Sequence, residues 1–351
     1  MRIAILGTGG IALGYAAMLS KGGHEVVLFS LSGEGGVCLR GKTIKSTGPI
    51  EHSFKLEIAD NLELALQHAA AVIIATTANY HRPLIDLLVP ALSEGQHVLV
   101  SAELSLSGSM LADQLCQSGK AVPVTSLGTT LLTARRAGKS EVVIGIVRNA
   151  CQAATEPASK QGVEIAFWRK VFGPVLEPAP ARLWITFSNL NPTVHAANAL
   201  CNFTRIENGE SWSNYAGITS SVANLIEAFD CERLSVAKAY GVHVVSLKDH
   251  YHTSFGFPHG MPLAEMTSAL HEKRKGRPRG PTSIETRYIT EDIPYGFVFI
   301  EYLGKQKAVA TPLHTAAIDL FSALYRRSFR IENPFIDNDL HNVLLPNPAL
   351  S

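Results

Sequence analysis

The sequence lacks the features that mark a membrane protein or a disulfide-stabilised secreted domain. No apolar run approaches the roughly 20 residues that a membrane-spanning helix needs. The first residues, MRIAILG, are typical of a buried strand and not of a signal peptide. The five cysteines are an odd number, widely scattered, and form no CxxC pair. We therefore expect reduced thiols in a cytoplasmic protein, without a disulfide framework or a metal site.

An excess of one charge is lacking as well. Lys and Arg number 31 against 30 Asp and Glu, so the formal net charge is +1. Nothing in this balance calls for nucleic acid or an anionic membrane as a partner. The most basic stretch, residues 271–279, is best interpreted as a solvated loop rather than a nucleic-acid-binding or nuclear-localisation segment, although it could also steer anionic substrates.

Short apolar runs alternate with helical patterns in the first half of the chain. Strands are predicted at residues 2–6, 25–29, 71–75, 97–100 and 141–147. Helices are predicted at residues 11–22, 84–92, 110–117 and 167–172. The strands are unbroken hydrophobic runs, as in a parallel sheet that helices cover on both faces. This alternation predicts a doubly wound α/β domain of the Rossmann type.

Strand signals nearly vanish in the second half. A proline-rich stretch at residues 176–183 marks the passage toward a second unit. Long stretches rich in Ala, Leu and Ser follow at residues 194–202, 221–240 and 311–327. A chain of 351 residues suits two domains, at roughly 100–200 residues per domain. We predict an α/β domain over residues 1–187 and a mainly α-helical domain over residues 188–351.

A glycine-rich turn joins the first predicted strand to the first predicted helix, and its sequence fits G-x-G-x-x-A. In such a turn the first glycine permits a tight bend, the second lets the backbone approach a pyrophosphate, and the small third residue lets helix and strand pack closely. Free N–H groups at the positive end of the helix then bind the phosphates. We predict a nicotinamide dinucleotide site formed by Gly7, Thr8, Gly9, Gly10 and Ile11.

The end of the second predicted strand bears on which nicotinamide cofactor binds. An NAD site usually carries Asp or Glu there, on the ribose 2′-OH, but this chain reads Phe-Ser-Leu-Ser over residues 29–32. Arg40 and two lysines follow shortly after. Hydroxyls and nearby cations suit a 2′-phosphate, so NADP(H) is favoured over NAD(H), with Ser30 and Arg40 as contacts. NAD(H) remains an alternative, because Arg40 and the two lysines could instead form a solvent-exposed face and Glu34 could bind a ribose.

Two segments of the second half carry specific motifs. Residues 188–195 contain N-P-x-x-H at a predicted helix start, where proline is well tolerated. Residues 287–296 read RY-x-x-EDIPYG, a run of polar and apolar residues that secondary structure alone does not require. Together with the glycine turn, these segments make the chain resemble the opine dehydrogenases (the octopine and nopaline dehydrogenase family) over most of its length.

The resemblance implies a histidine and aspartate catalytic pair and an arginine that binds a substrate carboxylate. Position by position, these fall on His195, Asp292 and Arg287, and Asn191 is a further expected substrate contact. The chain departs from many members at Ala196, where they carry proline after the histidine, and it is shorter than many of them. Each of the three also has a structural interpretation, as a core or surface histidine, a turn-capping aspartate and an ion-paired arginine.

The activity that the resemblance implies is reductive condensation of a 2-oxo acid with the amino group of an amino acid, using NAD(P)H. This is a reversible CH–NH oxidoreduction of amino acid metabolism. The chemistry suits these residues, because a histidine that titrates near neutral pH can polarise a carbonyl and move a proton. A carboxylate on its other nitrogen fixes the tautomer. An arginine can hold an α-carboxylate through two parallel hydrogen bonds.

Two alternatives remain. Dehydrogenases of the glycerol-3-phosphate and ketopantoate type share this architecture and act on a sugar phosphate or hydroxy acid, but they rely on a lysine for which we find no matching segment. A non-catalytic redox sensor would bind dinucleotide and needs no histidine and aspartate pair. The expected partners are the small-molecule substrates, a 2-oxo acid and an amino acid. The sequence leaves the oligomeric state open, a homodimer included.

Overall fold

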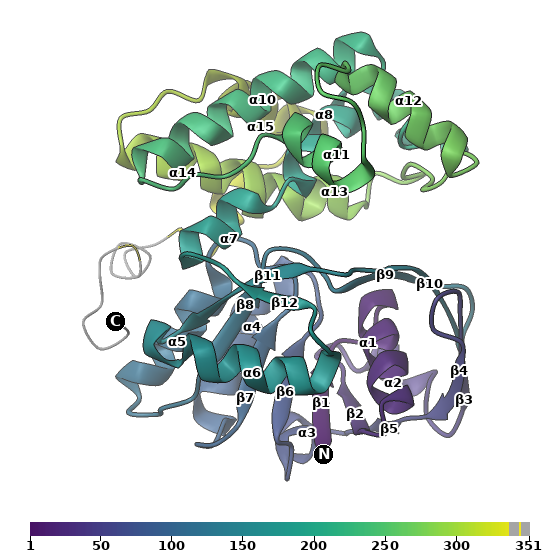
Figure 1. The fold of residues 1–351 in the computed structure, drawn as a ribbon, viewed down its shortest axis with the longest axis vertical. Coiled ribbons are helices and arrows are strands. Elements are labelled where there is room, and N and C mark those ends of the chain that lie inside the picture. Colours follow the sequence, from purple (N-terminus) through teal and green to yellow (C-terminus); the bar gives the residue numbers. More distant parts are fainter. Residues whose placement is uncertain (337–343, 345–351) are drawn as a thin grey trace. The chain divides into compact units, whose positions relative to one another are not determined.

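The computed structural model describes residues 1–336 and residue 344, and the described chain forms two compact units (Figure 1). The first unit is Met1–Thr186 and the second is Phe187–Ile336. Residues 337–343 and 345–351, which the sequence analysis assigns to the second domain, lie outside the described residues. Within the described part of the chain, no helix is long and apolar enough to cross a membrane.

An eight-stranded sheet forms the centre of the first unit, in the order β12-β11-β8-β7-β6-β1-β2-β5. Its strands are β1 (Arg2–Leu6), β2 (Glu25–Phe29), β5 (Glu57–Ile58), β6 (Ala71–Ile74), β7 (His97–Val100), β8 (Val124–Leu127), β11 (Cys151–Glu156) and β12 (Leu176–Pro178). Neighbours run parallel except for the pair of β8 and β11. The chain continues from β1 to β2 on one side and to β6 on the other, so the switch point of this doubly wound sheet lies at β1.

Helices cover both faces of this sheet, as predicted. They are α1 (Gly10–Lys21), α2 (Glu34–Val37), α3 (Leu62–Leu66), α4 (His81–Ala91), α5 (Ser107–Gln117) and α6 (Gln161–Phe172), and α7 (Arg182–Ser188) leads toward the second unit. Ile3 and Ile5 of β1 join a hydrophobic cluster with residues of α1 and α6. Ala4 and Leu6 point to the opposite face and are also 0% exposed. Burial of both faces explains the unbroken apolar strands.

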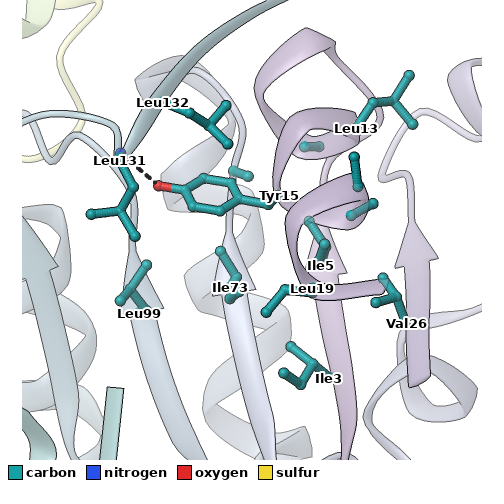
Figure 2. Close-up of a cluster of buried hydrophobic side chains, with 14 of the residues drawn as sticks. Ile3, Ile5, Leu13, Tyr15, Leu19, Val26, Ile73, Leu99, Leu131 and Leu132 are labelled. Atoms are coloured by element: carbon teal, nitrogen blue, oxygen red, sulfur yellow. Dashed lines mark hydrogen bonds between the residues drawn. The ribbon is translucent and has the colours of Figure 1, made fainter. Parts of the chain in front are cut away.

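Tyr15 fixes α1 to the sheet from within the core (Figure 2). Its side chain is fully buried in a cluster that includes Ile73 and Leu99. The hydroxyl lies 2.7 Å from Ser101 Oγ and accepts a hydrogen bond of 3.1 Å from the Leu131 N–H. Leaving a buried polar group without a hydrogen bond costs roughly 1–3 kcal/mol, so these two hydrogen bonds stabilise the buried position of the Tyr15 hydroxyl. They hold the helix that follows the glycine turn against the end of β7.

A second, smaller sheet has the order β4-β3-β10-β9. Its strands are β3 (Thr43–Thr47), β4 (His52–Lys55), β9 (Leu132–Arg136) and β10 (Glu141–Val147), of which the sequence analysis predicts β10 alone. This sheet packs closely on α1. A Cβ on Gly14 would lie 2.5 Å from Leu132 Cδ1, and one on Gly10 would lie 2.7 Å from the Ala134 carbonyl oxygen. Glycine at these two positions therefore lets α1 lie between the two sheets.

Helices make up the second unit, as predicted. They are α8 (Asn191–Cys201), α9 (Phe203–Glu207), α10 (Ser220–Ala239), α11 (Leu247–Phe255), α12 (Leu263–Lys273), α13 (Arg287–Thr290), the π-helix η3 (Ile293–Phe297), α14 (Val298–Gln306) and α15 (Pro312–Tyr325). Among residues 187–336, strand pairing is limited to one bridge between Ser213 and Arg279. The long helix α10 packs against α8, α12, α14 and α15, and its Ile226 and Phe229 lie in the core.

Candidate active site

His195 lies on a buried face of α8, one turn after the helix begins. Pro192 occupies the first turn, where its missing N–H leaves no helical bond unmade. The side-chain oxygen of Asn189 accepts the Asn191 N–H at 3.1 Å. Asn191 is half-buried, and because it precedes His195 by four residues it lies on the same side of the helix. The N-P-x-x-H motif thus sets where α8 begins and which way His195 faces.

Asp292 reaches His195 from a segment 97 residues further along the chain. The His195 Nδ1 and Asp292 Oδ2 atoms are 2.7 Å apart, and the two side chains are 10% and 3% exposed. Because a carboxylate only accepts hydrogen bonds, Nδ1 is the donor. The other ring nitrogen, Nε2, is then the proton acceptor of the neutral imidazole.

Close packing between the two motifs explains how this pair meets. Asp292 lies between α13 and the π-helix η3, which contains Gly296. A Cβ on Gly296 would lie 2.6 Å from Pro192 Cβ, so this approach of η3 to α8 requires glycine. The Pro294 carbonyl oxygen accepts a hydrogen bond of 2.9 Å from Asn333 Nδ2. Pro192 of the first motif and Gly296 of the second are thus packing partners.

Burial and two neighbouring charges set the ionisation of His195. Burial lowers the pKa of His195 most strongly, Asp292 opposes it by charge and hydrogen bonding, and the charge of Arg287 lowers the pKa further. The net shift is downward from the ordinary value near 6.5. The resting side chain is thus a neutral imidazole at neutral pH, ready to accept a proton. Once protonated, it is a stronger acid than a histidine in water.

Tyr288 stacks on His195, a contact that the sequence analysis does not predict. The ring centroids are 3.6 Å apart and the planes are inclined by 7°. Burial raises the pKa of Tyr288 to about 12, so its hydroxyl stays protonated. The adjacent Arg287 is 55% exposed and lies 3.8 Å from Glu291 Oε2, which leaves guanidinium donors for a ligand carboxylate. The only sequence signal for Tyr288 is its place beside Arg287 in the RY motif.

The glycine turn of the first unit has one open position. Gly7 has φ +136°, and a Cβ there would lie 2.4 Å from the Ala75 carbonyl oxygen, so the fold itself requires this glycine. Gly10 packs on the second sheet. At Gly9, by contrast, no described atom lies within 4 Å of a Cβ. The first hydrogen bond of α1 runs from Leu13 N to Gly9 O, and no side chain caps the helix. The open backbone and uncapped N–H groups fit a pyrophosphate.

The predicted residues around this turn lie close together. A Cβ on Gly35 would lie 2.0 Å from Thr8 Oγ1 and 3.6 Å from Ser30 Oγ, so both hydroxyls face the same backbone. The Ser30 and Ser32 hydroxyl oxygens are 3.4 Å apart. Ile11, in the first turn of α1, packs half-buried against the core. The turn and the end of β2 thus present hydroxyls at one place, as a ribose or its phosphate requires.

Two arginines near the hydroxyls of Thr8 and Ser30 differ in their contacts. Arg40 is 48% exposed and forms an ion pair with Asp60. Arg136 of β9 donates from Nη1 to the Thr8 carbonyl oxygen at 3.4 Å and from Nη2 to Cys38 Sγ at 3.1 Å. Arg136 is not predicted from the sequence, because the strand that carries it is not predicted and the contact spans 128 residues. No local pattern signals such a contact.

Two family models match the chain in succession. Residues 3–145 match ketopantoate reductase PanE/ApbA, and residues 178–325 match the α-helical domain of NAD/NADP octopine/nopaline dehydrogenase. Among solved structures, octopine dehydrogenase with NADH and L-arginine has a TM-score of 0.76 at 17% identity, covering 99% of this chain and 95% of that one. Yersinopine dehydrogenase with NADP⁺ has a TM-score of 0.73 at 16% identity, covering 99% and 96%. These structures share the fold.

Similarity to curated relatives extends over nearly the whole chain. The opine dehydrogenase of Arthrobacter sp. (strain 1C) is 27% identical over 349 residues, which cover 94% of this chain and 92% of that protein. Vitopine synthase of Allorhizobium ampelinum is 23% identical over 341 residues, covering 90% and 89%. With the family match of the helical half, this similarity shows that the protein is an NAD(P)-dependent oxidoreductase that resembles the opine dehydrogenases over nearly its whole length.

Proposed function

We propose that the protein catalyses the reversible, NAD(P)H-dependent reductive condensation of a 2-oxo acid with the amino group of an amino acid. The buried hydrogen bond between His195 and Asp292 carries the proposal, because it provides an oriented acid–base group, and the charge of Arg287 acts on the same imidazole. The relatives support it, since octopine dehydrogenase structures contain NADH with L-arginine or with pyruvate.

In this proposal residues 1–187 bind the dinucleotide and residues 188–351 bind the substrates. The pyrophosphate would be held by Gly7, Thr8, Gly9, Gly10 and Ile11, around the open position of the turn. When bound, the cofactor supplies the hydride that the imine carbon accepts. The remaining chemistry is proton transfer and substrate orientation, and the helical unit carries both.

His195 moves the protons of the condensation. The substrate amine attacks the carbonyl carbon of the 2-oxo acid, and in two successive transfers both amine protons move to the carbonyl oxygen. The oxygen leaves as water and a neutral imine forms. Nε2 of His195 accepts each amine proton in turn and delivers it to the departing oxygen. Asp292 holds the ring through Nδ1 and stabilises the imidazolium. In the oxidative direction the same atoms add water to the imine.

Arg287 and Asn191 orient the substrates around this histidine. The exposed guanidinium of Arg287 binds the carboxylate of the 2-oxo acid through two parallel hydrogen bonds. The amide of Asn191, on the same side of α8 as His195, contributes a further donor. The stacked ring of Tyr288 restricts rotation of the imidazole, so Nε2 keeps one direction.

We further propose that the enzyme prefers NADP(H) to NAD(H) and acts in cytoplasmic amino acid metabolism. The hydroxyls of Thr8 and Ser30 face one place at the end of β2, where an acidic residue for a ribose 2′-OH is missing. Arg40 and Arg136 supply the positive charge that a 2′-phosphate requires. Cys38 and the other four cysteines are free thiols, which suits a reducing compartment.

One observation favours an alternative, the reduction of a 2-oxo acid to a hydroxy acid without an amine. Residues 3–145 match the ketopantoate reductase model. That match covers the dinucleotide-binding half, whereas the acid–base group lies in the helical half. There the chain uses His195 in place of the lysine that such enzymes employ. The two activities differ in whether they need an amine.

The amine requirement therefore tests the proposed function. Purified protein is incubated with NADH or NADPH and an array of 2-oxo acids, with and without amino acids, and cofactor oxidation is followed by absorbance. We expect oxidation only when both substrates are present. The product should have the summed mass of the two substrates less one water plus two hydrogens. Hydroxy acid formation without any amine would support the alternative instead.

Asp292→Asn and Arg287→Gln should shift the pH profile in opposite directions. Condensation requires neutral His195 to accept the amine proton, so kcat/KM rises as the pH rises through the pKa of His195. Asp292→Asn removes a charge that raises this pKa, so the rising limb moves to lower pH. Arg287→Gln removes a charge that lowers it, so the limb moves to higher pH. Nuclear magnetic resonance titration of the imidazole measures the same shifts directly.

His195→Ala is the reference for this experiment. It should lack the limb altogether and reduce kcat by about 10²–10⁴-fold, the usual contribution of a general acid. Arg287→Gln should in addition raise KM for the 2-oxo acid, because ground-state binding is lost. Shifts of the two limbs in the same direction would contradict the assigned electrostatics. Near-normal turnover by His195→Ala would contradict the mechanism.

Gly9→Ala should weaken dinucleotide binding while leaving the fold intact. The protein has room for a Cβ at this position, so any loss arises from the pyrophosphate that approaches the backbone there. We expect at least about tenfold weaker binding by calorimetry, equivalent to about 1.4 kcal/mol. Gly162→Ala is the matched control, because no described atom lies within 4 Å of its Cβ either. Equal affinity of the two variants would refute the assignment of the turn.

Arginine variants test the cofactor preference. Arg40→Ala and Arg136→Ala should each weaken NADPH more than NADH, and Arg136→Ala should do so more strongly because Arg136 contacts the Thr8 carbonyl oxygen. One lost charge-assisted hydrogen bond corresponds to about tenfold in affinity. Arg135→Ala, an exposed neighbour on β9, removes the same charge as a control. Wild-type protein that binds NADH and NADPH equally would remove the basis for the preference.

A further inference from the structure

Arg274, directly after α12, has aromatic neighbours and, in the described part of the chain, no carboxylate partner. Its guanidinium lies 5.4 Å from the ring centroid of Tyr215 and 5.3 Å from that of Phe255. Nη1 donates a hydrogen bond of 2.9 Å to the Tyr215 hydroxyl. Across residues 1–336, the ion pairs of the protein do not include Arg274, whereas the buried Arg233 of the same unit pairs with Asp230. Arg274 is half-buried, so the guanidinium N–H groups that do not bond to Tyr215 are only partly exposed to solvent.

Two further tyrosines connect Arg274 to the proposed acid–base residue. Tyr251 is 9% exposed and Tyr288 stacks on His195. The pKa of Tyr251 is raised by burial, raised by Tyr215 and Tyr288, and lowered by Arg274, so these side chains lie within electrostatic reach of one another. Neither the Tyr251 nor the Tyr288 hydroxyl has a hydrogen-bond partner among the residues that the structure describes. The rings are largely buried, but neither hydroxyl oxygen is among the fully buried polar atoms without a partner, so a ligand can reach both hydroxyls and bond to them.

The helix that carries His195 also fixes this cluster. Asn198, one turn further along α8, is 0% exposed and donates from Nδ2 to Asn214 O at 2.8 Å and to Asn214 Oδ1 at 2.7 Å. Asn202 donates to Gly217 O at 3.2 Å. The segment between these contacts carries Tyr215. The position of Tyr215, and of the guanidinium bonded to it, is therefore set by the same helix as that of His195.

The reaction requires a second cation for a substrate carboxylate. A 2-oxo acid and an amino acid each bring one carboxylate, and the secondary amine product carries both. Arg287 binds one of them. A second carboxylate that enters a buried site without a partner would be strongly disfavoured by desolvation. Arg274, which lacks a carboxylate of its own, has the charge and the planar donors that such a group needs.

We infer that Arg274 binds the carboxylate of the amino-acid substrate, with the hydroxyls of Tyr251 and Tyr288 as further hydrogen-bond partners, while Arg287 holds that of the 2-oxo acid. This inference rests on the proposed function and assigns the second substrate to a defined group of side chains. It makes the enzyme selective for amines that carry a carboxylate over the corresponding decarboxylated amines. Within the basic stretch of residues 271–279, Arg274, which lies over the Tyr215 and Phe255 rings, is thus assigned the binding of one substrate carboxylate.

Arg274→Gln tests the inference by separating the substrates. With saturating 2-oxo acid, KM for the amino acid should rise by about 10–100-fold, the range of a lost charge-assisted pair. KM for the 2-oxo acid should stay within about twofold, because the variant leaves the contact between Arg287 and that substrate unchanged. The wild type should use the decarboxylated amine poorly, and Arg274→Gln should have the same activity with it as the wild type. Lys273→Gln, an exposed neighbour with the same change of charge, should match the wild type.

Tyr251→Phe is a second variant that keeps the buried ring and breaks no hydrogen bond among the described residues. It should raise KM for the amino acid by about threefold or more and leave the decarboxylated amine unaffected. Unchanged amino-acid KM in Arg274→Gln, or an equal loss with both amines, would overturn the inference and leave the proposed function standing. A wild-type enzyme that oxidises cofactor without any amine would overturn both.

Discussion

The hydrogen bond between His195 and Asp292 is the constraint on which the proposed chemistry of this protein depends. The two residues belong to different motifs, and nothing local brings them together. They meet because Gly296 of the π-helix lies against Pro192 at the start of α8, where a Cβ would come within 2.6 Å. The N-P and P-Y-G parts of the two motifs are thus structural, and the histidine and aspartate are carried on them. A larger residue at Gly296 would separate the pair without touching either side chain.

A comparable division holds within the glycine turn of the first unit. Gly7 and Gly10 are required by the protein itself, since each approaches a backbone oxygen of a neighbouring strand. Gly9 has no such contact among the described residues, and in the proposed function its lack of a side chain leaves room for the pyrophosphate. The helix behind the turn is fixed between the main sheet, through the Tyr15 hydroxyl, and the second sheet, through Leu132. Rigid support on both sides keeps the uncapped helix end in place for an anion.

The main sheet and the helical second unit could be predicted from the sequence, because buried parallel strands are unbroken apolar runs and long helices are strongly periodic. The second sheet could not, apart from β10. Its strands are short and alternate polar with apolar residues, as in the TIKST run of β3. The pairing of His195 with Asp292 followed from family resemblance, and no pattern in the sequence alone contains it. The sequence does not single out Tyr288, Arg136 and Arg274, because their proposed roles depend on contacts across distant segments.

The charges around His195 also suggest how substrate binding affects its acidity. Asp292 raises the pKa of His195, while burial and Arg287 lower it. In the proposed mechanism, a substrate carboxylate on Arg287 would neutralise the charge that opposes protonation, so the pKa of the imidazole would rise when the 2-oxo acid binds. His195 would then accept the amine proton more readily and pass it to the departing oxygen. One arginine would thereby both orient the substrate and couple its binding to the protonation of His195, which a neutral hydrogen-bond donor at position 287 could not do.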